Sequence, residues 1–394
     1  MPRDRHCPRY LESIKPKEVS SLIEQARHPA SKIMGSPVGA RMIIANREVD
    51  YFCGTSYYGL HGHPDVMEAA CEAVAAFGLG PATNAQVLPI ERVKGLTRTF
   101  FDVAHATYIV TGYLGAMVLA QALAPDYDVA FIDERSHFSI FDGVACSGKP
   151  VARFKHLDAN DLQFRLRELL HDGEVPLVMT DGVFPITGAI APLPDYVEVL
   201  RNHPESLLCV DDSHAVGVIG NLGRGTFEYF GLTGGDRLYM TGTLSKAFGG
   251  IGGIIPGNLA LADKISQNVR VTIGASPAPV PAAAAAAAGL QLLMEHPEMR
   301  EVLWANVLSV REGFRKLGFA LEDTPIPIVN LVGRPGLDLR RTEARLLNSG
   351  IAVLYVPPGS YSDAPSVESL RIAVFSTHTA EQIERLLDTC RRSL

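Results

Sequence analysis

The 394-residue chain lacks the features that mark membrane, secreted and nucleic-acid-binding proteins. No stretch of about 18 residues is apolar and free of charge, which excludes a membrane-spanning helix. The N-terminus, MPRDRHCPRY, is charged but has no apolar core behind it, so we expect no secretory signal. A net charge of −7 without a long basic run argues against binding to nucleic acid or to an anionic membrane surface.

Cysteines are scattered through the chain, and none forms a CxxC pair: Cys7, Cys53, Cys71, Cys146, Cys209 and Cys390. This distribution indicates reduced thiols rather than a disulfide framework or a zinc site, and it predicts a cytoplasmic protein. The sequence also has no internal repeat. Its composition, 47% apolar and 20% charged, is typical of a globular enzyme, and its length predicts two domains or one large domain with an appendage.

Between about residues 50 and 270, short apolar runs alternate with amphipathic segments. We expect strands at 106–112, 128–134, 175–182, 206–212 and 236–243. The segments between them, such as 158–172 and 193–203, have helical periodicity. Apolar strands separated by helices predict a parallel α/β sheet that is covered on both faces. Ligands bind beyond the carboxyl ends of such strands, where this chain places Asp133, Asp181, Asp211 and Thr243.

The remaining sequence predicts two further parts. Residues 10–28 alternate apolar and charged residues at helical spacing, which indicates an N-terminal helical arm at 1–48 before a large domain at 49–285. A long helix begins near Pro281. After it, a small C-terminal α+β domain is expected at 286–394, with strands at 326–333, 351–359 and 369–377.

One lysine lies among small residues in the stretch TGTLSKAFGG, residues 241–250. A surface lysine usually has charged neighbours, whereas Lys246 is surrounded by glycines and hydroxyl groups. Such a stretch at a strand end predicts backbone packed against a phosphate, with Thr243 and Ser245 available to it. A lysine that attacks a carbonyl must be partly desolvated, so that its amine is neutral. Taken alone, the pattern more often marks a structural or simple phosphate-binding lysine.

A second stretch, CVDDSHAVGVIG, supplies an acid and a base 35 residues before the lysine. An apolar strand delivers Asp211 to its carboxyl end, and His214 follows three residues later. A carboxylate there would keep a pyridine nitrogen protonated, and a histidine could donate to a phenolic oxygen. By itself, DDSH would equally suit a helix N-cap or half of a metal site. The two stretches together favour a pyridoxal phosphate site.

These two stretches, extended to CVDDSHAVGVIGNLGRG and TGTLSKAFGGIGG, resemble the core of the α-oxoamine synthase family. The similarity runs from YFCGTSYYGL to LRIAVFSTHT, and it is closest to the 2-amino-3-ketobutyrate CoA ligase, 8-amino-7-oxononanoate synthase and serine palmitoyltransferase branches. The resemblance implies a fold-type I pyridoxal phosphate-dependent transferase with a mostly parallel central sheet. It implies an acyltransferase that condenses an amino acid with acyl-CoA, or with a carrier-protein thioester, through aldimine and quinonoid intermediates. It also implies a homodimer with shared active sites.

The resemblance implies roles for four residues around the cofactor ring. Lys246 would form the internal aldimine and move the proton at the substrate α-carbon. Asp211 would pair with the pyridine nitrogen, and His214 would lie near the phenolic oxygen. His137, in SHFSIFDG, matches the histidine that stacks on the ring, although taken alone it would more often be a satisfied buried histidine.

Five further matches concern the phosphate and the substrate. Gly112 and Tyr113 match the turn whose backbone holds the phosphate, a role that Thr243 would share. Ser276 resembles the residue that reaches the phosphate from the neighbouring subunit. Arg371 matches the arginine that binds the substrate α-carboxylate, a task that suits a bidentate guanidinium. A salt bridge within the small domain is the alternative for this arginine.

Substrate-facing segments depart from the family pattern. Thr55, followed by Ser56, stands where the family has an asparagine, and Thr83 falls near the position of a family arginine. Pro185 replaces a serine and cannot donate a backbone hydrogen bond. We expect Thr55 and Ser56 to face the substrate. The departures leave two readings open: condensation with an unusual substrate pair, or cofactor chemistry redirected to aldol cleavage, racemisation, decarboxylation or transamination.

Two other interpretations carry less weight. A catalytically silent partner subunit is disfavoured because Lys246 is present. The HGH motif at 61–63 precedes a proline and predicts a turn at a helix start rather than a metal site, so we expect no metal.

Overall fold

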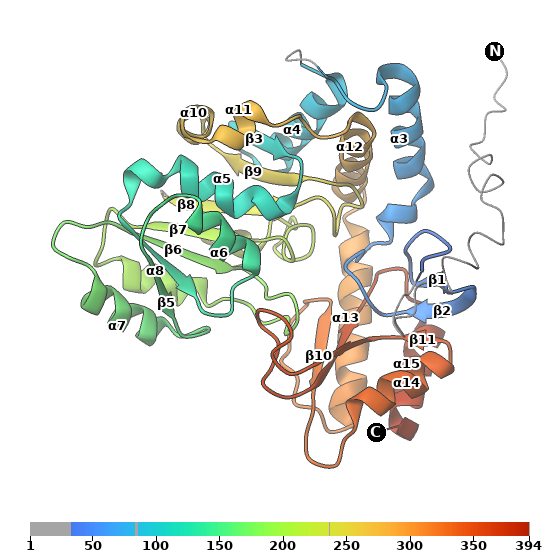
Figure 1. Ribbon diagram of the computed structural model, residues 1–394. Coiled ribbons are helices and arrows are strands. Elements are labelled where there is room, and N and C mark those ends of the chain that lie inside the picture. Colours follow the sequence, from blue (N-terminus) through green and yellow to red (C-terminus); the bar gives the residue numbers. More distant parts are fainter. Residues whose placement is uncertain (1–32, 83–85, 236, 394) are drawn as a thin grey trace.

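The computed structural model describes residues 33–82, 86–235 and 237–393, which form an α/β fold around a seven-stranded sheet (Figure 1). Across the sheet the strands are β3 (His105–Ile109), β9 (Gly253–Gly257), β8 (Leu238–Thr243), β7 (Leu207–Asp211), β6 (Pro176–Asp181), β4 (Val129–Asp133) and β5 (Val151–Phe154). Strands β8 to β5 are mutually parallel, and β9 runs antiparallel to β3 and β8. The five strands predicted in this region and the mostly parallel sheet are confirmed.

Alternate residues of the central strands face two separate hydrophobic cores. In β4, Phe131 belongs to one core and Ile132 to the other, because successive side chains of a strand point to opposite faces. Helices cover the Ile132 face: α5 (Gly115–Ala122), α6 (Phe138–Ala145) and α10 (Leu259–Asn268). Others cover the Phe131 face: α4 (Leu88–Phe101), α7 (Ala159–Leu169), α8 (Leu193–Leu200) and α12 (Val280–Glu295). Both faces are therefore buried, as the continuously apolar strands require.

The expected long helix after residue 280 is two helices. Helix α12 ends at Glu295 and α13 (Glu298–Lys316) begins after Pro297. Proline has no backbone N–H to continue the first helix and is tolerated at the start of the second. The prediction of one uninterrupted helix was wrong at this point.

The C-terminal third of the chain forms a second, smaller sheet with helices of its own. Strands β10 (Ile328–Val332), β13 (Ser369–Ala373) and β12 (Leu354–Val356) form an antiparallel sheet, with β13 in the centre. Helix α15 (Ala380–Ser393) packs against α13 and against α14 (Leu339–Asn348). This part lies below the large sheet in Figure 1.

The predicted N-terminal helical arm is corrected where the structure describes it. Residues 1–32 lie outside the described part, and residues 33–48 contain β1 (Arg41–Ile44) and the start of β2 (Arg47–Tyr51), not a helix. The two strands form a hairpin whose loop residues, Ala45 and Asn46, both have positive φ, as a type I′ turn requires. Strand β2 also pairs with β11 (Ile351–Ala352). The helical pattern of residues 10–28 therefore does not extend into residues 33–48, where exposed and buried residues alternate along β1 as in a strand.

Helix α3 and several short elements complete the described chain. They are η1 (Leu60–Gly62), α3 (Pro64–Phe77), η2 (Gly112–Leu114), η3 (Ala124–Asp126), α9 (Thr226–Tyr229) and α11 (Arg270–Gly274). The side chain of His63 accepts a hydrogen bond from the Asp65 N–H and caps α3, which confirms the predicted turn at HGH. Within the described ranges, no helix has the length and apolar character needed to cross a membrane.

Candidate active site

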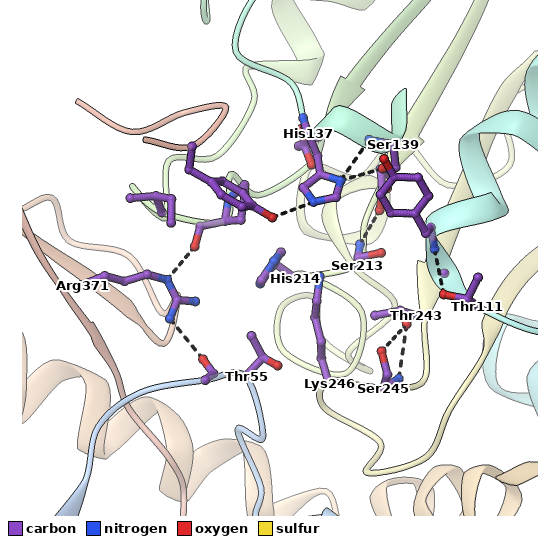
Figure 2. Close-up of a pocket in the computed structure, with 18 of the residues that line it drawn as sticks. Thr55, Thr111, His137, Ser139, Ser213, His214, Thr243, Ser245, Lys246 and Arg371 are labelled. Atoms are coloured by element: carbon purple, nitrogen blue, oxygen red, sulfur yellow. Dashed lines mark hydrogen bonds between the residues drawn. The ribbon is translucent and has the colours of Figure 1, made fainter. Parts of the chain in front are cut away.

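A cavity of about 440 Å³ opens at the carboxyl ends of β6, β7 and β8, where the C-terminal part of the chain meets the large sheet (Figure 2). Most of the predicted site residues line it: Lys246, Asp211, His214, His137, Gly112, Tyr113, Thr243, Thr55 and Arg371. The fold therefore brings together residues that are up to about three hundred positions apart in the sequence, as for Gly54 and Arg371 at a separation of 317.

Adjacent strand ends supply two carboxylates to the cavity. Asp181 of β6 and Asp211 of β7 are register partners in the parallel sheet. The Asp211 carboxylate accepts a hydrogen bond from the Ser213 N–H at 3.1 Å, and the Asp181 carboxylate accepts one from the His137 N–H at 2.7 Å. Burial, and then the nearby Asp211 charge, raise the pKa of Asp181 well above its usual range. Asp181 therefore holds a proton more readily than an ordinary carboxylic acid.

Lys246 follows β8 in a tight segment that contacts the backbone of neighbouring elements. Burial of its amine lowers the pKa to about 8, although the carboxylates of Asp211 and Asp181 oppose the shift. Gly249, with φ of +66°, approaches Leu60 so closely that an added Cβ would lie 2.5 Å from the Leu60 carbonyl carbon. The small residues that follow Lys246 therefore allow close packing against the backbone of a neighbouring element.

His214 lies on the same wall of the cavity and is buried. Its Nδ1 atom is 2.7 Å from the Tyr57 hydroxyl oxygen. Burial, with smaller contributions from the Lys246 and Arg371 cations, holds the pKa of His214 well below its usual range, so the ring is neutral at pH 7. Burial also raises the pKa of Tyr57 to about 12. The pair is uncharged and joined by one hydrogen bond.

Hydroxyl groups and a glycine gather at one end of the cavity. The Thr243 and Ser245 hydroxyl oxygens are 2.7 Å apart. A Cβ on Gly112 would lie 2.7 Å from the Thr243 hydroxyl oxygen, so only glycine fits between η2 and this hydroxyl group. Thr111 caps the turn by accepting from the Tyr113 N–H at 3.4 Å. The small residue Gly112 and the hydroxyl groups of Thr243 and Ser245 therefore leave a polar end of the cavity that suits an anion.

His137 stands at the start of α6, and its ring is held by three contacts. Its Nδ1 accepts from the Ser139 N–H at 3.2 Å and lies 2.7 Å from the Ser139 hydroxyl oxygen. Its Nε2 lies 2.8 Å from the hydroxyl oxygen of Tyr361. Burial lowers the pKa of His137, although the Asp211 charge opposes this. The ring is therefore neutral near pH 7.

Arg371 lies on the central strand β13 and is buried, with 3% of its surface exposed. Its Nε donates to the Pro185 carbonyl at 2.6 Å and its Nη1 donates to the Gly54 carbonyl at 3.1 Å. Among the described residues, no carboxylate lies within ion-pair distance of this guanidinium. The alternative of a salt bridge within the small domain is therefore wrong for these residues.

Two predicted residues, Ser56 and Ser276, do not line this cavity. Ser56 is turned away, with its hydroxyl oxygen 2.6 Å from His61 Nδ1, which corrects its expected place at the substrate. Tight burial beside η1 directs its side chain inward. Ser276 is exposed and lines a different cavity, beside β3. Thr83 lies outside the described residues.

The structure adds residues that the sequence did not indicate. Tyr361 lines the cavity, and the fully buried Asp363 anchors its loop to residues 186 and 187. The loop at 357–368 has no periodicity or family match that would single out either residue. Tyr57 was likewise missed, because an aromatic residue in an apolar run is usually core. Pro185 and Thr55, the residues that depart from the family pattern, both line the cavity.

Comparisons with known proteins agree with this arrangement. The family model for aminotransferase class I and II matches residues 57–389. The 8-amino-7-oxononanoate synthase of Methylococcus capsulatus is 35% identical over 365 residues, covering 91% of this chain and 92% of the relative. The enzyme of the same name from Thioalkalivibrio sulfidiphilus is 31% identical, with coverage of 96% and 97%. A solved structure of serine palmitoyltransferase from S. paucimobilis with a bound PLP–myriocin aldimine superposes with a TM-score of 0.85 at 26% identity, covering 99% and 98% of the two chains.

Proposed function

The chain belongs to the aminotransferase class I and II family and, within it, to the α-oxoamine synthase group, and we propose that it condenses an amino acid with an acyl thioester to give a 2-amino-ketone. The group consists of pyridoxal phosphate-dependent acyltransferases of fold type I. The observation that carries the proposal is a single cavity with a desolvated lysine beside Asp211 on one side and a buried arginine without an acidic partner on the other, among the described residues.

The residues of the cavity fit pyridoxal phosphate. Lys246 offers an amine, Asp211 offers a carboxylate, and the close approach of Gly112 to Thr243 leaves a cradle of N–H and O–H donors for a phosphate. When bound, this cofactor supplies a conjugated ring that takes up the electron pair released at the α-carbon of the amino acid. We assign the phosphate end to Gly112, Tyr113 and Thr243.

Lys246 provides both attachment and proton transfer. With a pKa of about 8, roughly one amine in ten is neutral at pH 7. A neutral amine acts as a nucleophile toward an aldehyde carbon and as a base toward the proton on a substrate α-carbon. We therefore assign covalent attachment of the cofactor and movement of the α-proton to Lys246.

Neighbouring groups set the charge around the ring site. We assign Asp211, at the end of β7, to the pyridine nitrogen of the cofactor. His214 is neutral, with Tyr57 fixing its ring, and would serve the phenolic oxygen. His137, held by contacts at both of its nitrogens, would stack on the ring of the cofactor.

Arg371 is assigned to the substrate α-carboxylate. The carbonyls of Pro185 and Gly54 orient the guanidinium, and further N–H groups remain for a planar carboxylate. Because the arginine is buried, an ion pair with the substrate forms where water screens it little.

A second candidate function follows from Thr55 and Pro185. Both line the cavity at positions where the family pattern has an asparagine and a serine, so the chemistry of the substrate side differs from that pattern. In this candidate the same cofactor site performs aldol cleavage, racemisation, decarboxylation or transamination of an amino acid, without an acyl donor.

We also propose a homodimer. Ser276 is exposed and lies outside the cavity of its own chain, which agrees with a residue that reaches the phosphate of a second copy. Light scattering on the purified protein tests this proposal, with about twice the mass of one chain as the expected result.

The function is tested on purified protein loaded with pyridoxal phosphate. We expect a yellow protein whose visible absorbance band is lost on borohydride treatment. Glycine, L-alanine and L-serine are then each mixed with acetyl-CoA, octanoyl-CoA or palmitoyl-CoA, and released thiol is followed. Thiol release that requires both substrates supports condensation. Turnover of an amino acid alone, with no thiol release from any donor, would establish the second candidate instead.

A further inference from the structure

The loop that joins β12 to β13, residues 357–368, is anchored at the cavity wall by a buried carboxylate. Asp363 is fully buried, and it accepts hydrogen bonds from the Ile186 N–H, the Thr187 N–H and the Thr187 hydroxyl at 2.8 to 3.0 Å. Three donors on one carboxylate fix the loop firmly, because each would be left unsatisfied if the loop moved. The side chain of Tyr361, two residues earlier, is therefore held at the cavity.

The contacts of His137 determine which of its nitrogens carries the proton. The Ser139 N–H can only donate, and it donates to Nδ1 at the start of α6. In a neutral imidazole, one nitrogen accepts and the other donates. Nε2 therefore carries the proton and donates a hydrogen bond to the hydroxyl oxygen of Tyr361 at 2.8 Å.

This polarity leaves the hydroxyl proton of Tyr361 available. A phenol has one O–H donor and can accept at the same time. Its oxygen already accepts from His137, and among the described residues no acceptor for its proton is found. Burial raises the pKa of Tyr361, so the phenol stays protonated at neutral pH. The cavity thus contains a fixed O–H donor next to the ring of His137.

We propose that Tyr361 is a catalytic residue that donates a hydrogen bond to the carbonyl oxygen of the acyl donor during condensation. In this step the electron pair of the substrate α-carbon forms a bond to the thioester carbon, and the C=O π pair moves to oxygen. The pair returns as the C–S bond breaks and the thiolate leaves. A fixed donor aimed at an oxygen that gains charge stabilises the transition state more than the ground state.

The acyl oxygen is the acceptor that the geometry favours. The α-carboxylate is assigned to Arg371, whose guanidinium is oriented by the carbonyls of Pro185 and Gly54. The Tyr361 hydroxyl instead touches His137, the residue assigned to the cofactor face, where the new carbon–carbon bond forms. This inference rests on the proposed condensation.

Tyr361→Phe tests the proposal, with Tyr355→Phe as a matched control. Tyr355 lies in the preceding strand and donates to Glu368 at 3.0 Å, outside the cavity. We expect Tyr361→Phe to lower the kcat of thiol release from acyl-CoA by about 10²-fold, as for other single oxyanion donors. Exchange of the amino acid α-proton in D₂O without acyl-CoA, and the dissociation constant of the amino acid, should stay within about two-fold of wild type, which corresponds to a small free-energy change.

The outcomes separate three cases. Equal losses in α-proton exchange and thiol release, or a weakened affinity for the amino acid, would overturn the role at the acyl oxygen. Unchanged thiol release in Tyr361→Phe would overturn it as well. Wild-type protein that exchanges the α-proton but releases no thiol from any acyl-CoA would instead overturn the proposed condensation.

A spectroscopic measurement tests the proton arrangement without activity. In ¹⁵N-histidine-labelled protein, the His137 signals are assigned by their loss in His137→Gln. We expect Nε2 to carry the proton and Nδ1 to be unprotonated. A proton on Nδ1 would reverse the donor order along the His137–Tyr361 pair and overturn the proposal.

Discussion

Two walls of one cavity are built in different ways. The cofactor wall, Asp211, His214, Thr243 and Lys246, follows two adjacent parallel strands within 35 residues of sequence. The substrate wall, Thr55, Pro185, Tyr361 and Arg371, comes from segments as far apart as Gly54 and Arg371, at a separation of 317 residues. Backbone pairing positions the first wall, whereas side-chain contacts such as those of Arg371 position the second.

We assign cofactor binding to the first wall and selection of the substrate to the second. Backbone hydrogen bonds between parallel strands fix the spacing of the strand ends, whatever side chains follow them. The residues of the cofactor wall are therefore held at fixed relative positions. Loops anchored by single side chains can change without disturbing the ladder. The departures from the family pattern at Thr55 and Pro185 both fall on the substrate wall.

Lys246→Ala breaks the cofactor wall and has the largest expected effect. Loss of the attachment and proton-transfer group should lower the rate of thiol release by about 10⁴-fold. Thiol release and the borohydride-sensitive absorbance band are measured together. Lys264→Ala is the control, because that lysine pairs with Asp126 away from the cavity. Residual activity within ten-fold of wild type, roughly 1.4 kcal/mol, would contradict the role of Lys246.

Arg371→Lys breaks the substrate wall alone. A lysine cannot reproduce the bidentate fork, so the KM of the amino acid should rise by about 10²-fold, while the visible absorbance of the bound cofactor stays unchanged. Steady-state kinetics measure the KM, and absorbance spectra show whether the band of the bound cofactor is unchanged. The exposed Arg391→Lys serves as the control. An unchanged KM, or a lost cofactor band, would show that the two walls are not separate in the way described.

Asp363→Ala loosens the substrate wall without touching it directly. The Ile186 N–H, the Thr187 N–H and the Thr187 hydroxyl lose their acceptor, so the free energy of unfolding should fall by about 1–3 kcal/mol. The KM for the amino acid should rise by about ten-fold, or roughly 1.4 kcal/mol, because Pro185 orients Arg371 from the same segment. Urea unfolding and kinetics are compared with the exposed Asp388→Ala. A loss of cofactor affinity as large as the rise in KM would contradict the conclusion that the two walls have separate tasks.

The prediction with the smallest expected effect on activity concerns how the stability of the protein near the substrate wall depends on pH. His378 accepts from the Phe375 N–H and bonds the Tyr51 carbonyl, and burial lowers its pKa from 6.5 to about 4. The unfolded chain binds the proton more readily than the folded protein, so stability is lost as the pH falls from about 6.5 towards 4. Urea unfolding should show this residue contributing a loss of about 2 kcal/mol between pH 7 and pH 5.

His378→Gln is the comparison for this measurement. The variant should be less stable at pH 7, and its stability should depend less on pH by that same amount. An identical pH dependence in both proteins would contradict a neutral buried His378.

The fold could be predicted where sequence and tertiary structure agree. Continuously apolar strands such as β6 and β7 are recognisable because both faces of a parallel sheet are buried. The prediction failed at β1 and β2, because the helical arm inferred from the pattern at 10–28 was extended over residues that form a hairpin, whose second strand pairs with β11. It also failed at Ser56, because the family resemblance places this segment at the substrate without showing which of two adjacent hydroxyl groups turns inward.

The sequence by itself determined the family and the cofactor, and it predicted which residues would form the cofactor wall. Asp211 and Lys246 follow neighbouring strands, and a parallel sheet brings successive strand ends together with little freedom. For the substrate wall the sequence indicated Arg371 and Thr55, but only the tertiary structure showed the contacts that assemble this wall. The partnership of Tyr361 with His137 spans 224 residues, and the anchor of Asp363 on residues 186 and 187 spans 177 and 176. Contacts between loops at that distance depend on how two packed layers meet, and no local pattern encodes that meeting.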